Sequence, residues 1–364
     1  MAGAVEATLA RADPTPAPRG AESRMVPSAR MRGLPNLPDM WRVLKEADLG
    51  KVRREAERPF QILLLAEDVR DAERLGELLS GPAGSRHPWL LPTDSAEAAR
   101  YARSEPLDLA VAVSSTPDRS PGLASGVDAL REARVPVVQV VVGSHAPTAG
   151  VVRPGEAARV TVAELELSAM PVVARALLSA VAPGVRLAVA RHLAPLREPL
   201  FDDLIEETAR TNAMYALTAG LAEVVPGVGV PLNLADIVVL TKNQLVMSYR
   251  IALASGKKGT PRDVVGEMLG VIGGGFLFRQ GARQLVGLLP VAGIVPKVAM
   301  AYAGTLAIGK AVVAWAAHGS VLEPGTVRGL YRQSLARGRD VARSLVARAR
   351  TRVPGPRWLR HRPG

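Results

Sequence analysis

The residues best placed for chemistry in this chain follow its first aliphatic run. The run FQILLLA at 60–66 leads into Glu67 and Asp68, and the segment continues as EDVRDAER. A nucleotide phosphate needs a glycine-rich loop at this point, because glycine amides surround the phosphates, a lysine contacts them and a Ser or Thr hydroxyl binds Mg²⁺. Acidic side chains repel phosphate instead. The segment therefore predicts that the chain carries no nucleotide chemistry here.

One segment comes closer to a phosphate-binding loop, GTLAIGKA at 304–311. Its two glycines and Lys310 have the required spacing, but Ala311 stands where the magnesium-binding hydroxyl belongs. No strand signal precedes it, and AYAGTLAIGKAVVAWAA is typical of one apolar helix with a face of small residues. The base-reading Asn-Lys-x-Asp element is also missing, since VGSHAP stands in its place at 142–147. We expect no enzyme activity and no cofactor, and weak nucleotide binding stays open as the alternative.

The same acidic pair permits a second interpretation, a degenerate receiver domain that accepts a phosphoryl group on an aspartate. Such an aspartate should end the run LDLAVAV at 107–113, where Val113, Ser114 and Ser115 stand instead. Asp118 lies too far into the following loop to replace it. The sequence therefore does not support phosphotransfer either.

Metal chemistry lacks the residue types it needs. The chain has no cysteine, which excludes disulfides, cysteine metal sites and a cysteine nucleophile, and which fits a reducing compartment. The five histidines are scattered without metal-ligand spacing. We predict no metal site.

The elements that position these residues fall into two classes along the chain. Aliphatic runs predict strands at 60–66, 107–115, 135–143 and 159–166, and helical segments alternate with them. This alternation is typical of an α/β domain with a parallel sheet. Strand signals stop after Met170, and apolar helical segments with Pro and Gly corners follow. We predict an α/β domain followed by an all-α domain of apolar helical hairpins.

The predicted organisation has five parts. They are a disordered tail rich in Pro, Ala and Arg at 1–38, an amphipathic lead-in helix at 39–58, the α/β domain at 59–198, the helical domain at 199–320 and an Arg-rich tail at 321–364.

Polar residues form a stripe on an otherwise aliphatic helical segment. Asp236, Asn243 and Arg250 are spaced by seven residues and so share one helix face, with Gln244 beside them. A helix that is apolar nearly all round is buried, and an unpaired buried charge costs several kcal/mol, so this stripe must find partners. Lys310 on a later helix is one candidate. We interpret the stripe as a buried polar network that fixes helix packing, with an ion or proton path as the alternative.

The excess positive charge of the chain is concentrated at its end. From 326 to 364 eleven arginines stand against Asp340 alone, a net charge of +10 out of +12 for the whole chain. Such a segment attracts anionic phospholipid or nucleic acid, and no aromatic nucleic-acid motif accompanies it. The residues predicted to contact anionic lipid are Arg337, Arg339, Arg343, Arg348, Arg350 and Arg352.

A family resemblance rests on the segments DDLIEETARTNAMYAL and VVPGVGVPLNLADIVVLTKNQLVMSYRIALASG with the apolar helices after them. Over roughly 202–319 the chain resembles the YcjF-like family, a domain of unknown function. This similarity is carried by Asn212, Pro231, Asp236, Gln244, Met247 and Gly256. The preceding part, 41–197, is similar in the order of its elements to the Era-like GTPase domain that is fused to this family, but it departs from that domain at both nucleotide motifs.

The resemblance implies a bacterial membrane protein on the cytoplasmic side. Together with the residues above, it predicts a non-catalytic scaffold or regulatory protein with a pseudo-GTPase domain, bound to anionic lipid, with a protein partner or a second copy of the chain as further partners. The N-terminus shows no secretion signal. Two alternatives stay open: a divergent nucleotide-responsive switch and an ion-conducting helical protein.

Overall fold

The computed structural model describes most of the chain beyond its N-terminal segment. The described residues are 48–81, 87–104, 106–116, 120–143, 148–149, 158–222, 234–271, 294–320 and 323–352. The predicted tail at 1–38 and the first part of the predicted lead-in helix lie outside these residues.

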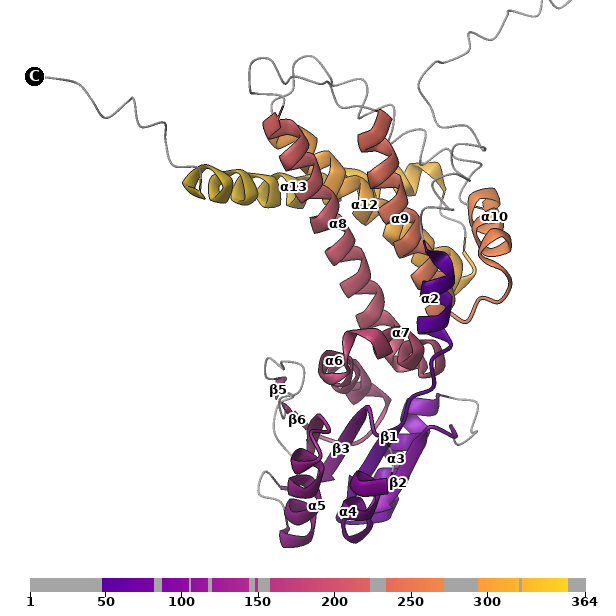
Figure 1. The fold of residues 1–364 in the computed structure, drawn as a ribbon, viewed down its shortest axis with the longest axis vertical. Coiled ribbons are helices and arrows are strands. Elements are labelled where there is room, and N and C mark those ends of the chain that lie inside the picture. The colour runs from indigo at the N-terminus through magenta and orange to yellow at the C-terminus, as the bar shows by residue number, and fades with distance from the viewer. Residues whose placement is uncertain are drawn as a thin grey trace, which may run out of the picture. The chain divides into compact units, whose positions relative to one another are not determined.

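A parallel sheet forms the first half of the described chain (Figure 1). The strands are β1 (Ile62–Ala66), β2 (Leu90–Asp94), β3 (Leu109–Ser114), β4 (Val137–Val142), β5 (Thr148–Ala149) and β6 (Ala158–Val162). They lie in the order β2-β1-β3-β4-β6-β5, and all neighbours are parallel except the short β5, which pairs antiparallel with β6. The predicted parallel α/β fold is therefore confirmed.

Two strands were not predicted, the two-residue β5 and the longer β2 with the sequence LLPTD. Its Pro92 cannot donate to a sheet ladder, which argues against a central strand. The structure places β2 at the edge of the sheet, where Pro92 lies opposite Leu64 of β1 and needs no partner on its other side.

Helices cover both faces of the sheet. The helices are α3 (Val69–Ser80), α4 (Ser95–Ser104), α5 (Pro121–Glu132) and α6 (Met170–Ala180). Alternate residues of β1 divide between two cores: Ile62 and Leu64 pack with α3 and α6, and Leu63 and Leu65 pack with α4 and α5. This alternation explains why the strand is aliphatic at every position.

The second half is helical, as predicted. Its elements are α7 (Pro183–His192), α8 (Arg197–Ala222), α9 (Leu234–Ala254), α10 (Pro261–Val271), α12 (Ile294–His318) and α13 (Pro324–Arg352), with short 3-10 turns at Leu167–Ala169 and Ala194–Leu196. The helix α12 packs against α8, α9 and α13. Glycines permit these close approaches, since a Cβ on Gly309 would lie 2.5 Å from Ile205 and one on Gly338 would lie 2.6 Å from the Ala299 carbonyl oxygen.

The lead-in helix α2 (Leu49–Ala56) docks on the helical half, against α7 and α9, before the chain enters the sheet. Glu55 pairs with Arg250 of α9 at 3.2 Å. At the end of α9 the Arg191 guanidinium donates to the carbonyls of Leu253 and Lys257, at 2.7 and 3.3 Å. An arginine is favourable there, because the last carbonyls of a helix lack partners and carry negative charge.

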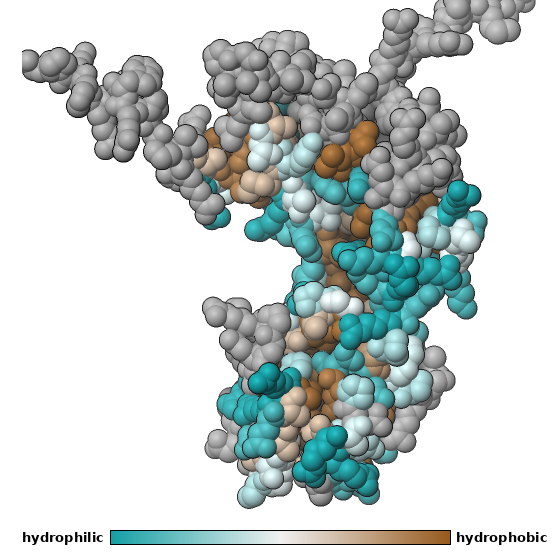
Figure 2. Space-filling model, in the orientation of Figure 1, coloured by the Kyte–Doolittle hydropathy of each residue, from teal (hydrophilic) through white to brown (hydrophobic). Residues whose placement is uncertain are grey.

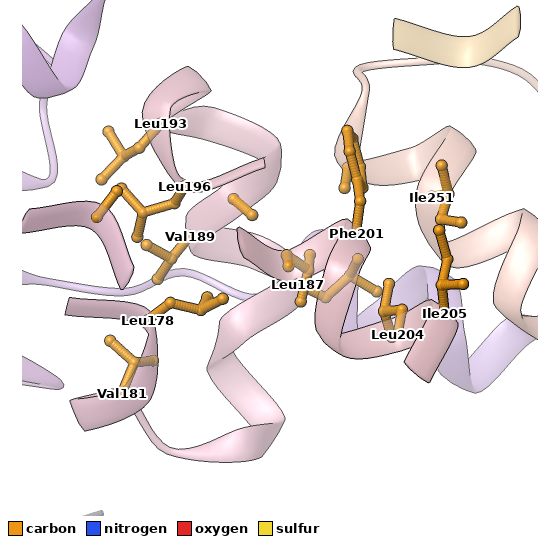
Figure 3. Packing of buried hydrophobic residues seen from close by; sticks show 14 of the residues in the cluster. Leu178, Val181, Leu187, Val189, Leu193, Leu196, Phe201, Leu204, Ile205 and Ile251 are labelled. Carbon is orange, nitrogen blue, oxygen red and sulfur yellow. The ribbon is translucent and has the colours of Figure 1, made fainter. Parts of the chain in front are cut away.

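The apolar core runs without a break from the sheet face of α3 and α6 into the helical half. Figure 3 shows this passage, in which side chains of α6, α7, α8 and α9 interdigitate. The labelled residues are Leu178, Val181, Leu187, Val189, Leu193, Leu196, Phe201, Leu204, Ile205 and Ile251.

Among the described residues, α12 is the one helix long and apolar enough to cross a membrane. Within its most apolar window, 78% is buried against the rest of the protein. The core helix of a helical bundle meets the same criterion of length and composition, and the packing of α12 is of that kind. The Pro/Gly corner at 223–233 and residues 272–293 lie outside the described residues.

Candidate functional site

The carboxyl ends of β1 and β3 meet where the strand order reverses, which is where doubly wound sheets bind ligands. Glu67 follows β1 at this edge, and its Oε1 accepts a hydrogen bond of 2.9 Å from the backbone amide of Ser120. Ser120 is the N-cap of α5. A helix N-terminus offers amides to an anion, and here the carboxylate of Glu67 already receives one of them.

A buried pair lies behind Glu67 at the same edge. The Gln139 Nε2 of β4 donates to the Ser114 hydroxyl at 3.0 Å, and that hydroxyl donates to the Thr116 carbonyl at 2.9 Å. Gln139 is 1% exposed and Ser114 is 2% exposed. The strand position at which a receiver domain would carry its phosphoacceptor thus holds a buried serine whose hydroxyl makes two hydrogen bonds within the protein. Asp118 lies outside the described residues.

Four neutral side chains, two of them fully buried and two partly buried, form a hydrogen-bonded cluster between α8, α9 and α12. Asn212 donates to the Thr305 hydroxyl at 3.0 Å and to the Leu240 carbonyl at 3.4 Å, and it accepts from Asn243 at 2.8 Å. Gln244 also donates to the Thr305 hydroxyl, at 3.1 Å. Asn212 and Thr305 are fully buried. The structure therefore places Asn243 and Gln244 together with two residues from other helices.

The rest of the predicted network does not join this cluster. Arg250 pairs with Glu55 of α2, and Lys310 is exposed on α12. The prediction of one network was wrong because α9 is long and packs against several helices. It contacts α8 and α12 as well as α2 and α7, so residues of one stripe have different neighbours. Asp236 lies in α9, and its side chain is outside the described part of the chain.

Glu206 of α8 was not predicted from the sequence, and its hydrogen bonds connect α8 with α12 and α13. Its carboxylate accepts from Arg210 at 2.6 Å, from the Tyr302 hydroxyl of α12 at 2.8 Å and from Arg337 of α13 at 3.1 Å. Burial alone would raise the pKa of Glu206, but the hydrogen bonds from Arg210 and Tyr302 and the charge of Arg337 outweigh it and hold the pKa below its usual range. Burial and the bond to Glu206 raise the pKa of Tyr302 to about 12.

The helix α13 is amphipathic and basic. Its apolar side packs on α12 through Ala342, Val346 and Gly338. The predicted lipid-contact residues with described side chains all lie exposed: Arg337, Arg339, Arg343 and Arg348. The side chains of Arg350 and Arg352 lie outside the described residues. Arg343 pairs with Asp340 on its own helix at 3.4 Å.

A cluster of four rings at the amino end of the sheet was also not predicted. Phe60 precedes β1, His87 and Trp89 precede β2, and His192 ends α7. The ring centroids of His192 and Trp89 are 4.2 Å apart, and those of His192 and His87 are 5.3 Å apart. Burial, with further contributions from His87, Arg191 and Arg197, lowers the pKa of His192 to about 4. The separation of these residues in sequence left no spacing signal to find.

Within the described parts of the chain, no three His, Asp or Glu side chains gather as metal ligands do. No protein-family model, curated protein or solved structure matches this chain.

Proposed function

We propose that this chain is a non-catalytic scaffold or regulatory protein that works at the cytoplasmic surface of the membrane. In this proposal it is a YcjF-like protein whose α/β domain is a pseudo-GTPase. The observation that carries the proposal is the bond from the Ser120 amide to Glu67, because it sets a carboxylate at the helix N-terminus of the ligand-binding edge. An incoming phosphate would have to displace that carboxylate and would be repelled by it.

The proposed GTPase-like origin rests on the order of elements in the sequence and not on the order of strands in the sheet. The parallel strands β2-β1-β3-β4-β6 have the flavodoxin-like doubly wound order with a reversal beside β1, an order that receiver domains also have. The nucleotide chemistry would lie in the loops after β1 and β4, and the sequence of this chain lacks the required residues in both.

Membrane binding is supported by where the apolar segments attach. Gly220 near the end of α8 contacts Ile294 at the start of α12. The described helices α8 and α12 therefore come together at one end, and in the sequence this end adjoins the stretches 223–233 and 272–293, which are rich in Val, Leu and Gly. The basic helix α13 crosses α12 at Ala299, close to that end. An apolar sequence joined to a helix end, together with exposed arginines on a neighbouring helix, is typical of binding to anionic membrane surfaces.

The surface of the helical half agrees with this arrangement. Figure 2 shows apolar patches on α9 and around the crossing of α8, α12 and α13, and hydrophilic surface over α2. The buried cluster at Thr305 favours a structural role over an ion path, because its described members are neutral and hydrogen-bonded to one another.

Nucleotide titration of the purified full chain tests the pseudo-GTPase part. We expect no binding of GTP or GDP with Mg²⁺ at micromolar concentrations, with an active P-loop GTPase as the positive control. Micromolar Mg²⁺-dependent binding would contradict the proposal and favour the nucleotide-responsive switch.

Vesicle sedimentation tests the membrane part. We expect the chain to sediment with vesicles containing phosphatidylglycerol and less with pure phosphatidylcholine vesicles, and we expect added salt to weaken the binding. A chain that stays in the supernatant with both vesicle types at low salt would refute membrane association.

A further inference from the structure

The pairing of Arg337 differs in kind from that of its neighbour Arg343. Arg343 pairs with Asp340 inside α13, whereas Arg337 reaches across to Glu206 of α8. Its side chain remains 63% exposed while it makes this bond. Arg337 thus stands between two environments, a carboxylate of the protein and the solvent on the basic side of α13.

Glu206, which is partly buried, can release Arg337 without becoming an unpaired charge. Arg210 donates to it at 2.6 Å from the same helix, and the Tyr302 hydroxyl lies within 3.0 Å of both carboxylate oxygens. Two arginines therefore share one carboxylate, and the group carries a net charge of +1. Loss of Arg337 leaves Glu206 neutralised by Arg210, so the release avoids the cost that removing the partner of a buried ion usually carries.

We propose that Glu206 is an internal counterion that competes with anionic lipid headgroups for Arg337. The inference rests on the membrane binding proposed above and adds its regulation. Headgroup phosphate draws Arg337 away from Glu206, which loosens the tie between α13 and α8. Because coupling between two equilibria is reciprocal, the Arg337–Glu206 pair weakens lipid binding by the same factor by which bound lipid weakens the pair, so removing the pair tightens lipid binding.

The position of Arg337 lets this exchange act on helix packing. The next residue, Gly338, lies against the Ala299 carbonyl at a close approach of α13 and α12. A change in the Arg337–Glu206 pair therefore occurs beside a close contact between α13 and α12. Lipid binding at this point is coupled to how firmly α13 covers α12.

The test uses Glu206→Gln in the full chain with phosphatidylglycerol vesicles. Glutamine keeps the shape and an acceptor for Tyr302 but removes the negative charge. We expect about fivefold tighter binding at moderate ionic strength, the gain for one basic residue freed near an anionic surface. In the background of Arg337→Gln, the further change Glu206→Gln should give no such gain. The matched control is Glu207→Gln, which removes the same charge from the adjacent exposed position of α8.

The outcomes separate the two proposals. Equal gains for Glu206→Gln and Glu207→Gln, or a gain that survives Arg337→Gln, would overturn the counterion role while membrane binding stands. A wild-type chain that ignores anionic vesicles would overturn both. If Glu206→Gln fails to fold, Glu206→Asp is the second test, since it keeps the charge but shortens the side chain that reaches α13. We expect Glu206→Asp to bind vesicles more tightly than the wild type. Unchanged binding would count against the inference.

Discussion

At the scale of single residues, the Thr305 hydroxyl uses its full hydrogen-bonding capacity. It accepts from Asn212 and Gln244 and donates to the Ala301 carbonyl at 2.8 Å. A hydroxyl has one donor and two acceptor sites, so none is left over. The cluster around it is therefore sensitive to the loss of one oxygen atom.

Replacing Thr305 by Val keeps the shape and removes that oxygen. The amide of Gln244 then loses this acceptor and that of Asn212 keeps only the long bond to Leu240, so we expect a loss of about 1–3 kcal/mol in the free energy of unfolding. Urea unfolding measures it. Thr305→Ser retains the hydroxyl and should lose clearly less, and equal losses in the two variants would argue that only packing matters here.

Because of His192, the free energy of unfolding should depend on pH. Its pKa is about 4 in the folded chain and about 6.5 when unfolded, so between these values the unfolded state binds more protons. Stability should therefore fall as the pH drops from about 6.5 towards 4. In His192→Phe, which cannot titrate, we expect a smaller difference in urea midpoint between pH 7 and pH 5 than in the wild type. The same difference in both proteins would show that His192 does not contribute.

At the scale of elements, the crossing of α13 over α12 depends on the missing side chain of Gly338. Alanine is the better helix former by about 1 kcal/mol, but its Cβ at this position would meet the Ala299 carbonyl oxygen at 2.6 Å. The clash involves backbone and cannot be relieved by turning a side chain. The helix would have to move away from α12.

We therefore expect Gly338→Ala to lower the melting temperature. Gly329 on the same helix is the matched control, since it is exposed and a Cβ there meets nothing within 4 Å. Gly329→Ala should raise the stability by up to about 1 kcal/mol through helix propensity alone. Equal effects of the two substitutions would mean that α13 is not packed at this crossing.

The elements also show what the sequence could and could not predict. The run at Ile62 to Ala66 is aliphatic on both faces, and that pattern identified a central strand. The edge strand β2 was missed because Pro92 is read as a breaker, and only the sheet shows that its open side has no partner.

The limits of prediction are sharper for the candidate site. Asn243 and Gln244 were found because they interrupt an aliphatic helix. The partner of Asn243 is Asn212, 31 residues away, and that of Gln244 is Thr305, 61 residues away, which resembles any helical threonine. Glu206 and Arg337 are 131 residues apart, so no local period could have paired them.

At the scale of the whole molecule, the continuous core predicts that the sheet and the helices unfold together. Buried residues of α6, α7 and α8 belong to one cluster with the face of the sheet that packs on α3 and α6. Single-domain cooperativity gives coincident transitions for different probes.

The chain carries a natural probe in each half, Trp89 before β2 and Trp315 in α12. In two variants, one of these tryptophans is kept and the chain's other three are replaced by Phe. We expect their urea transitions, followed by tryptophan fluorescence, to have matching midpoints. The stability of each variant, measured by circular dichroism, corrects for the substitutions. Separate transitions would show that the two halves unfold independently and that the shared core is energetically weak.

The docking of α2 has a consequence for synthesis on the ribosome. Glu55 and Arg250 are separated by 195 residues, so at roughly 5–20 residues per second α2 emerges about 10–40 seconds before the helix that receives it. During that interval Leu49 and Val52, which are buried in the finished protein, have no α9 to cover them. The sheet can fold in the meantime, and the nascent chain must keep α2 from associating elsewhere until its distant partner is made.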